Sequence, residues 1–221
     1  MNDTLSPIEV RILGCLIEKE ATTPDVYPLT LNSLLTACNQ KSSREPVMEL
    51  TADEVLPALD HLIDKTLVST WKAGHNRMAK YQHKLRHRVS DKFNFTAPEL
   101  AVLGVLFLRG PQTVGEIRSR SARIHEFDGL EAVSKVLAAL EANTDGPYVT
   151  MLARQEGRKE PRYAHLFCGE PDEAVQTGAG SERVVSGGSS RLEALELEVV
   201  ELKSQLQALE QRFEAFKQQF E

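Results

Sequence analysis

The chain has 221 residues, of which 41% are hydrophobic and 26% are charged, and its formal net charge is −6. This composition is typical of a globular protein and leaves room for two domains of about 80 residues. No apolar run reaches the ~18 residues of a membrane span, and Met1-Asn-Asp-Thr does not begin a secretory signal, so we expect neither. The three widely spaced cysteines indicate reduced thiols in the cytoplasm rather than a disulfide framework or a zinc site.

Positive charge is concentrated in one short segment. Residues 1–71 and 170–221 each carry −6 and residues 93–169 are neutral, whereas residues 72–92 carry +6. A basic segment of this kind is typical of contact with a polyanion. The alternative is a solvated basic surface that balances two acidic flanks.

Two stretches of the chain are near-copies of each other, residues 5–19 (LSPIEVRILGCLIEK) and 95–109 (FTAPELAVLGVLFLR). The similarity continues downstream, where Thr30 matches Thr113 and the run 80–83 (KYQH) matches 162–165 (RYAH). An echo of about 80 to 90 residues is too long for a solenoid repeat and indicates two copies of one small domain. We therefore predict one domain at residues 1–90 and a second at 91–169.

The first copy begins with a predicted helix. Ser6 or Thr4 can cap it, and Pro7 fits its first turn. A break at residues 25–28 precedes a short helix capped by Thr30.

A third helix and two strands complete the first copy. Thr51 with Glu54 has the spacing of a capping box and predicts the start of this helix, in which Pro57 is expected to cause a local distortion. Residues 67–71 and 78–83 alternate like strands around a turn at 73–76.

The second copy repeats this order. Helices are predicted at residues 97–109, after Thr113 and at 130–143, followed by strands at 148–154 and 162–167. Gly14 and Gly104 occupy matching positions inside the first helix of each copy. Glycine costs a helix interior about 1 kcal/mol relative to alanine, so its reuse predicts a close crossing where a methyl group would clash.

Three helices followed by a two-stranded hairpin are the winged variant of helix-turn-helix. The predicted fold class is therefore mainly α with small β-hairpins (α+β), built as two tandem winged helix-turn-helix domains.

The C-terminal region has a different pattern. Residues 170–190 are rich in Gly, Ser and charge, which indicates a flexible linker. Residues 191–221 carry an apolar heptad and predict a coiled-coil helix that makes the protein a homo-oligomer, with a dimer expected. Docking onto the chain's own domains or onto a partner protein is the alternative. The residues predicted to pair are Leu195, Val199, Leu202, Leu206, Leu209, Phe213 and Phe216.

Signatures of catalysis are missing. The chain has no Gly-rich phosphate loop, nucleophile elbow or HExxH pair, so we expect a non-enzymatic protein without a cofactor. His83 and His87 lie four residues apart, but they fall in a basic segment that would repel a cation. We expect no metal site, and packing roles for His83 and His165 beside Tyr81 and Tyr163.

Nucleic-acid binding is the sharper hypothesis. In winged helices the third helix commonly enters the major groove and the hairpin contacts phosphates. The third helix here is acidic in the first copy and carries few groups that read bases, which disfavours sequence-specific reading. A protein-interaction scaffold that uses these acidic faces is the alternative. The residues predicted to contact DNA backbone are Lys41, Arg44, Lys72, Arg77, Lys80, Lys84, Arg86, Arg118, Arg120, Arg158 and Lys159.

The segment at residues 37–46 (ACNQKSSREP), taken with the starts of the two repeats at Leu5 and Phe95, resembles the YceH-like family of bacterial proteins. The resemblance covers residues 5–169. It implies a tandem winged-helix fold in the bacterial cytoplasm and supplies no catalytic residues, because the family is itself of uncharacterised function.

Overall fold

The computed structural model describes residues 4–71, 78–86, 93–153 and 160–171, all within one compact unit, Met1–Gly178. Helices and small antiparallel sheets alternate along these residues, which confirms the predicted α+β class. A search of these ranges finds no helix with the length and hydrophobicity of a membrane span.

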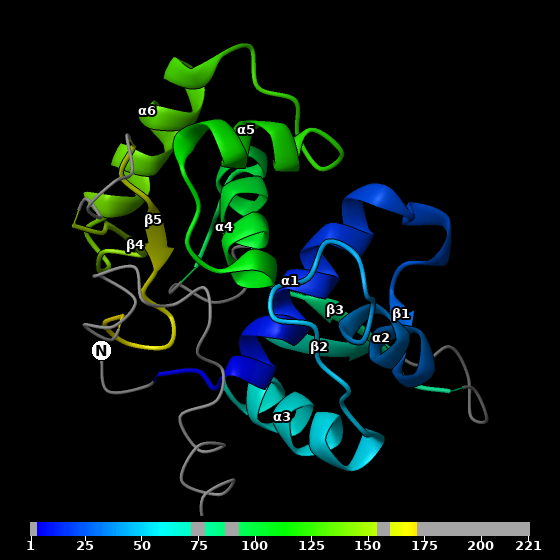
Figure 1. Ribbon diagram of the computed structural model, residues 1–221. Coiled ribbons are helices and arrows are strands. Elements are labelled where there is room, and N and C mark those ends of the chain that lie inside the picture. The colour runs from blue at the N-terminus through cyan, green and yellow to red at the C-terminus, as the bar shows by residue number, and fades with distance from the viewer. Residues whose placement is uncertain (1–3, 72–77, 87–92, 154–159, 172–221) are drawn as a thin grey trace, which may run out of the picture. The chain divides into compact units, whose positions relative to one another are not determined.

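The first copy is a helical layer with a three-stranded sheet (Figure 1). A short 3₁₀ turn separates its first helix from its first strand, and its sheet has the order β1-β3-β2 with antiparallel pairs. Strand β1 was not foreseen, because two residues are too few to show an alternating pattern. The elements are α1 (Pro7–Thr22), β1 (Leu29–Thr30), α2 (Leu31–Cys38), α3 (Ala52–Asp64), β2 (Val68–Trp71) and β3 (Lys80–His83).

The helices begin where the capping residues predict. The Ser6 hydroxyl accepts a hydrogen bond from the Glu9 N–H (3.3 Å), and the Glu9 carboxylate accepts one from the Ser6 N–H (2.6 Å). At the start of α2 the Thr30 hydroxyl accepts a hydrogen bond from the Ser33 N–H (3.3 Å), without a reciprocal bond. Helix α3 runs through Pro57 without interruption, so the expected distortion does not break it. Proline there has no N–H to donate, and the helix nevertheless continues to Asp64.

The second copy has the same order of elements. Helix α4 ends at Gly110, whose φ of 67° favours glycine. In place of β1 there is a single bridge from Gln112 to Tyr163 of the second hairpin strand. The two strands are shorter than predicted. The elements are α4 (Ala97–Arg109), α5 (Val114–Ser121), α6 (Leu130–Glu141), β4 (Val149–Met151) and β5 (Tyr163–His165).

Helices α1 and α4 pack against each other and join the two copies (Figure 1). A Cβ atom on Gly14 would lie 2.9 Å from Leu108 Cγ and 3.0 Å from Phe107 Cβ. A Cβ atom on Gly104 would lie 3.1 Å from Ile17 Cγ2. The predicted close crossing is therefore confirmed, and each glycine meets the equivalent helix of the other copy.

The backbone contacts between the copies are reciprocal. The Leu5 N–H donates to the Phe167 carbonyl (2.7 Å), and the Phe95 N–H donates to the Leu85 carbonyl (2.9 Å). Leu5 matches Phe95 in the repeat, and Leu85 matches Phe167. The N-terminal end of each copy is therefore hydrogen-bonded to the C-terminal end of the other. This is the pattern of an isologous interface in a two-fold dimer. The repeats are paired within one chain as two subunits would be.

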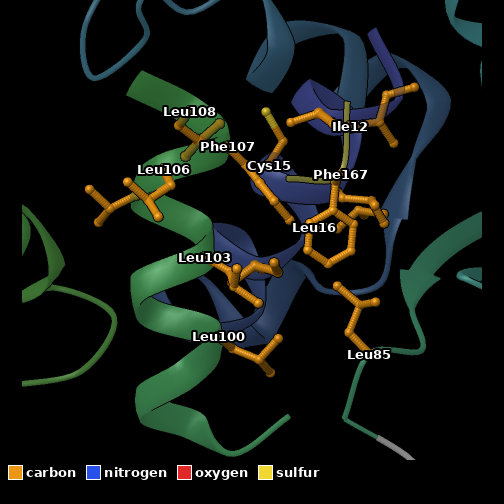
Figure 2. Close-up of a cluster of buried hydrophobic side chains, with 14 of the residues drawn as sticks. Ile12, Cys15, Leu16, Leu85, Leu100, Leu103, Leu106, Phe107, Leu108 and Phe167 are labelled. Carbon is orange, nitrogen blue, oxygen red and sulfur yellow. The ribbon is translucent and has the colours of Figure 1, made fainter. Parts of the chain in front are cut away.

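One hydrophobic core extends through both copies (Figure 2). Leu16 of α1 and Leu103 of α4 are both fully buried in it, with Leu85 and Phe167 beside them. A cut between residues 90 and 91 would expose the apolar surface between α1 and α4, at a cost of about 25 cal/mol per Å². Independent folding of residues 1–90 and 91–169 stays a prediction.

Candidate nucleic-acid interface

Strands β2 and β3 place polar and aromatic side chains on one face of the first sheet. Directly paired residues share a face, and the register pairs Trp71 with Lys80 and Ser69 with Gln82. The Gln82 amide donates to the Ser69 hydroxyl across the pair (3.1 Å). Lys84 continues the alternation, and its N–H donates to the Leu67 carbonyl (2.8 Å). We call Ser69, Trp71, Lys80, Gln82 and Lys84 the β2–β3 outer face.

The cations of the β2–β3 outer face are not neutralised by described residues. Neither Lys80 nor Lys84 forms an ion pair within the ranges that the structure describes. Trp71 is 50% exposed beside them, whereas Tyr81 and His83 on the opposite face are buried. Just beyond β3, the half-exposed Arg86 lies 3.8 Å from Glu20. An uncovered indole next to free ammonium groups suits contact with a polyanion that also presents flat or apolar surfaces.

The described part of the second hairpin differs. By the two registers, Leu152 and Arg162 occupy the places of Trp71 and Lys80. Leu152 is buried, and Arg162 donates to the Pro111 carbonyl (2.8 Å) and lies 3.4 Å from Glu116. The equivalent cation is therefore used inside the protein, so the β2–β3 outer face is the stronger candidate.

The remaining predicted contacts are scattered. Lys41 lies exposed in the loop after α2, and Arg118 lies exposed on α5. Arg120 bonds to the Gln112 side-chain oxygen and lies 3.6 Å from Glu116, so it is partly neutralised. Predicted residues outside the described ranges are Lys72, Arg77, Arg158, Lys159 and the heptad from Leu195 to Phe216.

Arg44 was predicted to contact phosphate, and this prediction is wrong for the folded chain. Its side chain is fully buried, with Nη2 2.6 Å from a Glu18 carboxylate oxygen of α1 and Nε 3.0 Å from the Ala37 carbonyl. Sequence spacing placed it in a polar turn, which is usually exposed. Here the guanidinium turns inward, where Glu18, 15% exposed, supplies a counter-charge.

The motif at residues 37–46 is structural. Fully buried Arg11 of α1 donates to the Cys38 carbonyl (3.3 Å) and the Pro46 carbonyl (2.6 Å), and burial lowers the pKa of its guanidinium. The Glu45 N–H donates to the Leu108 carbonyl at the end of α4 (2.8 Å). The motif thus connects the first copy to the helix of the second, rather than forming a site.

The two matching histidines are packing residues, as expected, but with other ring neighbours. His83 Nδ1 accepts from the Leu85 N–H (3.3 Å), which leaves Nε2 to donate to Glu20 (3.0 Å). Its nearest ring is Tyr27, and that of His165 is Phe107. Over the described ranges, no group of three or more His, Cys, Asp or Glu side chains could hold a metal ion.

His165 makes the fold sensitive to acid. Burial lowers its pKa from 6.5 to about 4, and its Nδ1 atom is buried without a partner in the described structure. Between pH 6.5 and pH 4 this histidine is protonated in the unfolded chain but not in the folded chain. The free energy of unfolding is therefore fully present at neutral pH and falls as the pH is lowered through this range. At about pH 5 the loss amounts to about 2 kcal/mol.

Urea unfolding at about pH 7.5 and about pH 5 checks this expectation. His165→Phe removes the proton site and should lose less stability on acidification than the wild type does, by about 2 kcal/mol. Equal losses in the two proteins would show that His165 is not the group responsible.

The third helices do not suit a DNA groove. The outward side of α3 carries four exposed carboxylates: Asp53, Glu54, Asp60 and Asp64. On α6, Lys135 is paired with Glu131 at 2.9 Å. Acidic side chains would meet phosphate repulsion in a groove, which supports contact through the hairpin instead.

Sequence reasoning missed two features of the surface. The first is Trp71. Strand alternation together with the register of the hairpin places it beside Lys80. The second is a group of arginines between the copies, around Arg109 and Arg123. No sequence signal brings these together, because their proximity depends on how α4 packs against α5.

Taken together, these observations define a class of protein: a duplicated α+β domain, fused through its first helices, with a basic hairpin face. Residues 5–158 match the family described as protein of unknown function, DUF480. The chain belongs to this YceH-like family, which confirms the resemblance seen in the sequence.

Relatives match the chain over almost its whole length. A UPF0502 protein of Serratia proteamaculans is 47% identical, over 96% of this chain and 98% of the relative. One from Aliivibrio fischeri is 48% identical, over 92% of this chain and 94% of the relative. The UPF0502 protein YceH of Salmonella paratyphi B is 44% identical, over 95% and 97%.

Proposed function

We propose that each repeat is a winged helix-turn-helix domain and that the protein is a non-enzymatic, DNA-associated regulator of the bacterial cytoplasm. The order helix, strand, helix, helix, strand, strand and the sheet order β1-β3-β2 support the fold assignment for the first copy. The Gln112–Tyr163 bridge supports it for the second copy, since it replaces β1 at the matching place. In this proposal the β2–β3 pair is the leading wing.

The β2–β3 outer face is the observation that carries the proposal. Lys80 and Lys84 supply charge that no described carboxylate neutralises, and Trp71, which pairs with Lys80, supplies an exposed ring. Lysines on a wing neutralise backbone phosphates without reading sequence, so binding is driven by counterion release. The acidic α3 keeps the third helix out of the groove.

Duplex DNA is expected to quench or shift the fluorescence of Trp71, the single tryptophan of the chain, with an affinity that falls steeply with salt. Lys80→Gln with Lys84→Gln should weaken binding and reduce the slope of log affinity against log salt by about 2, since two phosphate contacts are removed. Fluorescence titrations at several salt concentrations measure both quantities.

Lys135→Gln is the matched control, because it removes one exposed lysine from α6 rather than from the wing. It should leave the slope unchanged. A loss of slope in Lys135→Gln, with none in the wing variant, would place the contact on α6 and contradict the wing proposal.

We further propose that the C-terminal heptad makes the protein a homodimer. A dimer would carry two basic wings and gain affinity for long DNA through effective concentration. This part of the proposal comes from the sequence pattern of residues 191–221, which lie outside the described residues.

A second candidate function is a protein-interaction scaffold. The four exposed carboxylates of α3 favour it, because they suit a basic protein partner. Absence of any fluorescence or anisotropy change with DNA at low salt would contradict the first proposal and favour this one.

A further inference from the structure

The seam between the two copies contains a small pocket whose lining includes three arginines. Its walls come from α1, the loop after α2, and helices α4 and α5, so both repeats contribute. The cavity measures about 40 Å³, which is room for about three water molecules. Its polar lining residues are Glu18, Thr22, Ser43, Arg109, Arg120 and Arg123.

Positive charge in this pocket exceeds the negative charge available to balance it. Glu18 is already engaged by Arg44, at 2.6 Å. Arg120 is partly neutralised by Glu116, whereas Arg109 and Arg123 form no ion pair with any residue that the structure describes. Burial, and then repulsion from Arg120, lowers the pKa of Arg109, and attraction to Glu45 and Glu18 offsets this only in part. An anion beside Arg109 would relieve the remaining unfavourable arrangement.

The walls also have the donors and the surroundings that an oxyanion needs. Guanidinium groups bind oxyanions with paired N–H donors, and Ser43 adds a hydroxyl group, whereas the Thr22 hydroxyl already donates to the Glu18 carbonyl (2.8 Å). Ser43 adopts a φ of 61°, an uncommon backbone for a residue other than glycine, and such strain is often found at binding sites. Buried Leu108 and Val105 form an apolar part of the wall, which strengthens charge interactions by excluding water.

We propose that this seam pocket binds a small oxyanion of the phosphate class, held by Arg109, Arg120 and Arg123 between the two repeats. The site is separate from the β2–β3 outer face and does not depend on nucleic-acid binding. Because the ligand contacts both copies, it stabilises their packing and couples pocket occupancy to the rigidity of the α1–α4 seam.

Thermal unfolding of the full chain in inorganic phosphate, against chloride at equal ionic strength, tests the site. Phosphate at ten times its dissociation constant should raise Tm by roughly 3 to 6 °C. Arg109→Gln and Arg123→Gln should each abolish most of this rise. Arg118→Gln, an exposed arginine of α5 outside the pocket, should retain it.

A Tm in chloride close to that of the wild type shows that a variant is folded, whatever its response to phosphate. Arg123 is exposed, so Arg123→Gln is the substitution less apt to disturb folding. An equal rise in the wild type and both pocket variants would overturn the proposal, as would no rise in the wild type. The DNA titration distinguishes the source of the phosphate group. If the pocket binds a free oxyanion, Arg109→Gln leaves the affinity for DNA unchanged. If that variant loses DNA binding and the wild type shows no phosphate-dependent rise in Tm, the pocket contacts DNA backbone and the proposal is overturned.

Discussion

Replacing Glu18 by alanine is expected to lower the free energy of unfolding by about 3 kcal/mol. The change leaves the guanidinium of Arg44 buried without its counter-charge, since the side chain of Arg44 has no exposure and Glu18 is its carboxylate partner at 2.6 Å. Breaking a buried pair from one side costs more than the pair contributes, because the surviving charge keeps its desolvation penalty. Urea unfolding at neutral pH measures the loss.

The double variant Glu18→Ala with Arg44→Met separates the charge from the packing. Removing both charges should recover a large part of the loss, so the two single changes are strongly non-additive. Glu131→Ala is the matched control: its ion pair with Lys135 has a similar distance, 2.9 Å, but both side chains are exposed. That variant should show no measurable change. A loss below about 1 kcal/mol for Glu18→Ala would mean that solvent reaches Arg44.

Filling the space at Gly14 is expected to separate α1 from α4. Gly14→Ala should cost about 2 kcal/mol, and Gly14→Val about 3 kcal/mol, despite the gain in helix propensity. The added Cβ would lie 2.9 Å from Leu108 Cγ and 3.0 Å from Phe107 Cβ. These atoms are close to the backbone of α4, so rotating a flexible side-chain end cannot relieve the clash and the helix itself must move.

Alanine substitutions at two other glycines provide comparisons for Gly14→Ala. Gly104→Ala should cost less, because its nearest neighbour is a methyl carbon of Ile17 at 3.1 Å. Gly115→Ala in α5 should stabilise the protein by about 0.5 kcal/mol, since its nearest atom lies 4.0 Å away. Thermal or urea unfolding of the three alanine variants gives the order. A stabilising Gly14→Ala would contradict the close crossing.

Much of the local structure could be predicted. Ser6, Thr30 and Thr51 mark helix starts because their hydroxyls satisfy backbone N–H groups within three residues, and this information is local. The hairpin strands followed from alternation for the same reason. Strand β1 could not be predicted, because its two residues are held by a partner strand about 50 residues further along the chain.

The candidate site was predicted only in part. Lys80 and Lys84 were expected on a hairpin, and the register places them on one face with Trp71. Arg44 was misplaced, because a basic residue in a polar turn is usually solvated and only the position of Glu18 on α1 draws it inside. Arg120 was predicted to contact phosphate, but its place in a pocket with Arg109 was not predicted. Their proximity depends on the packing of α4 against α5, and α1 adds a further wall of the pocket.

The repeat, the order of elements and the need for small residues at Gly14 and Gly104 were determined by the sequence, because each is a pattern of spacing within one copy. The tertiary structure decided what those glycines face, that Leu5 and Phe95 bond to the opposite copy, and which arginines are buried. The physical reason is that burial and charge pairing arise between segments far apart in the chain. No pattern within a segment specifies the surface that will cover it.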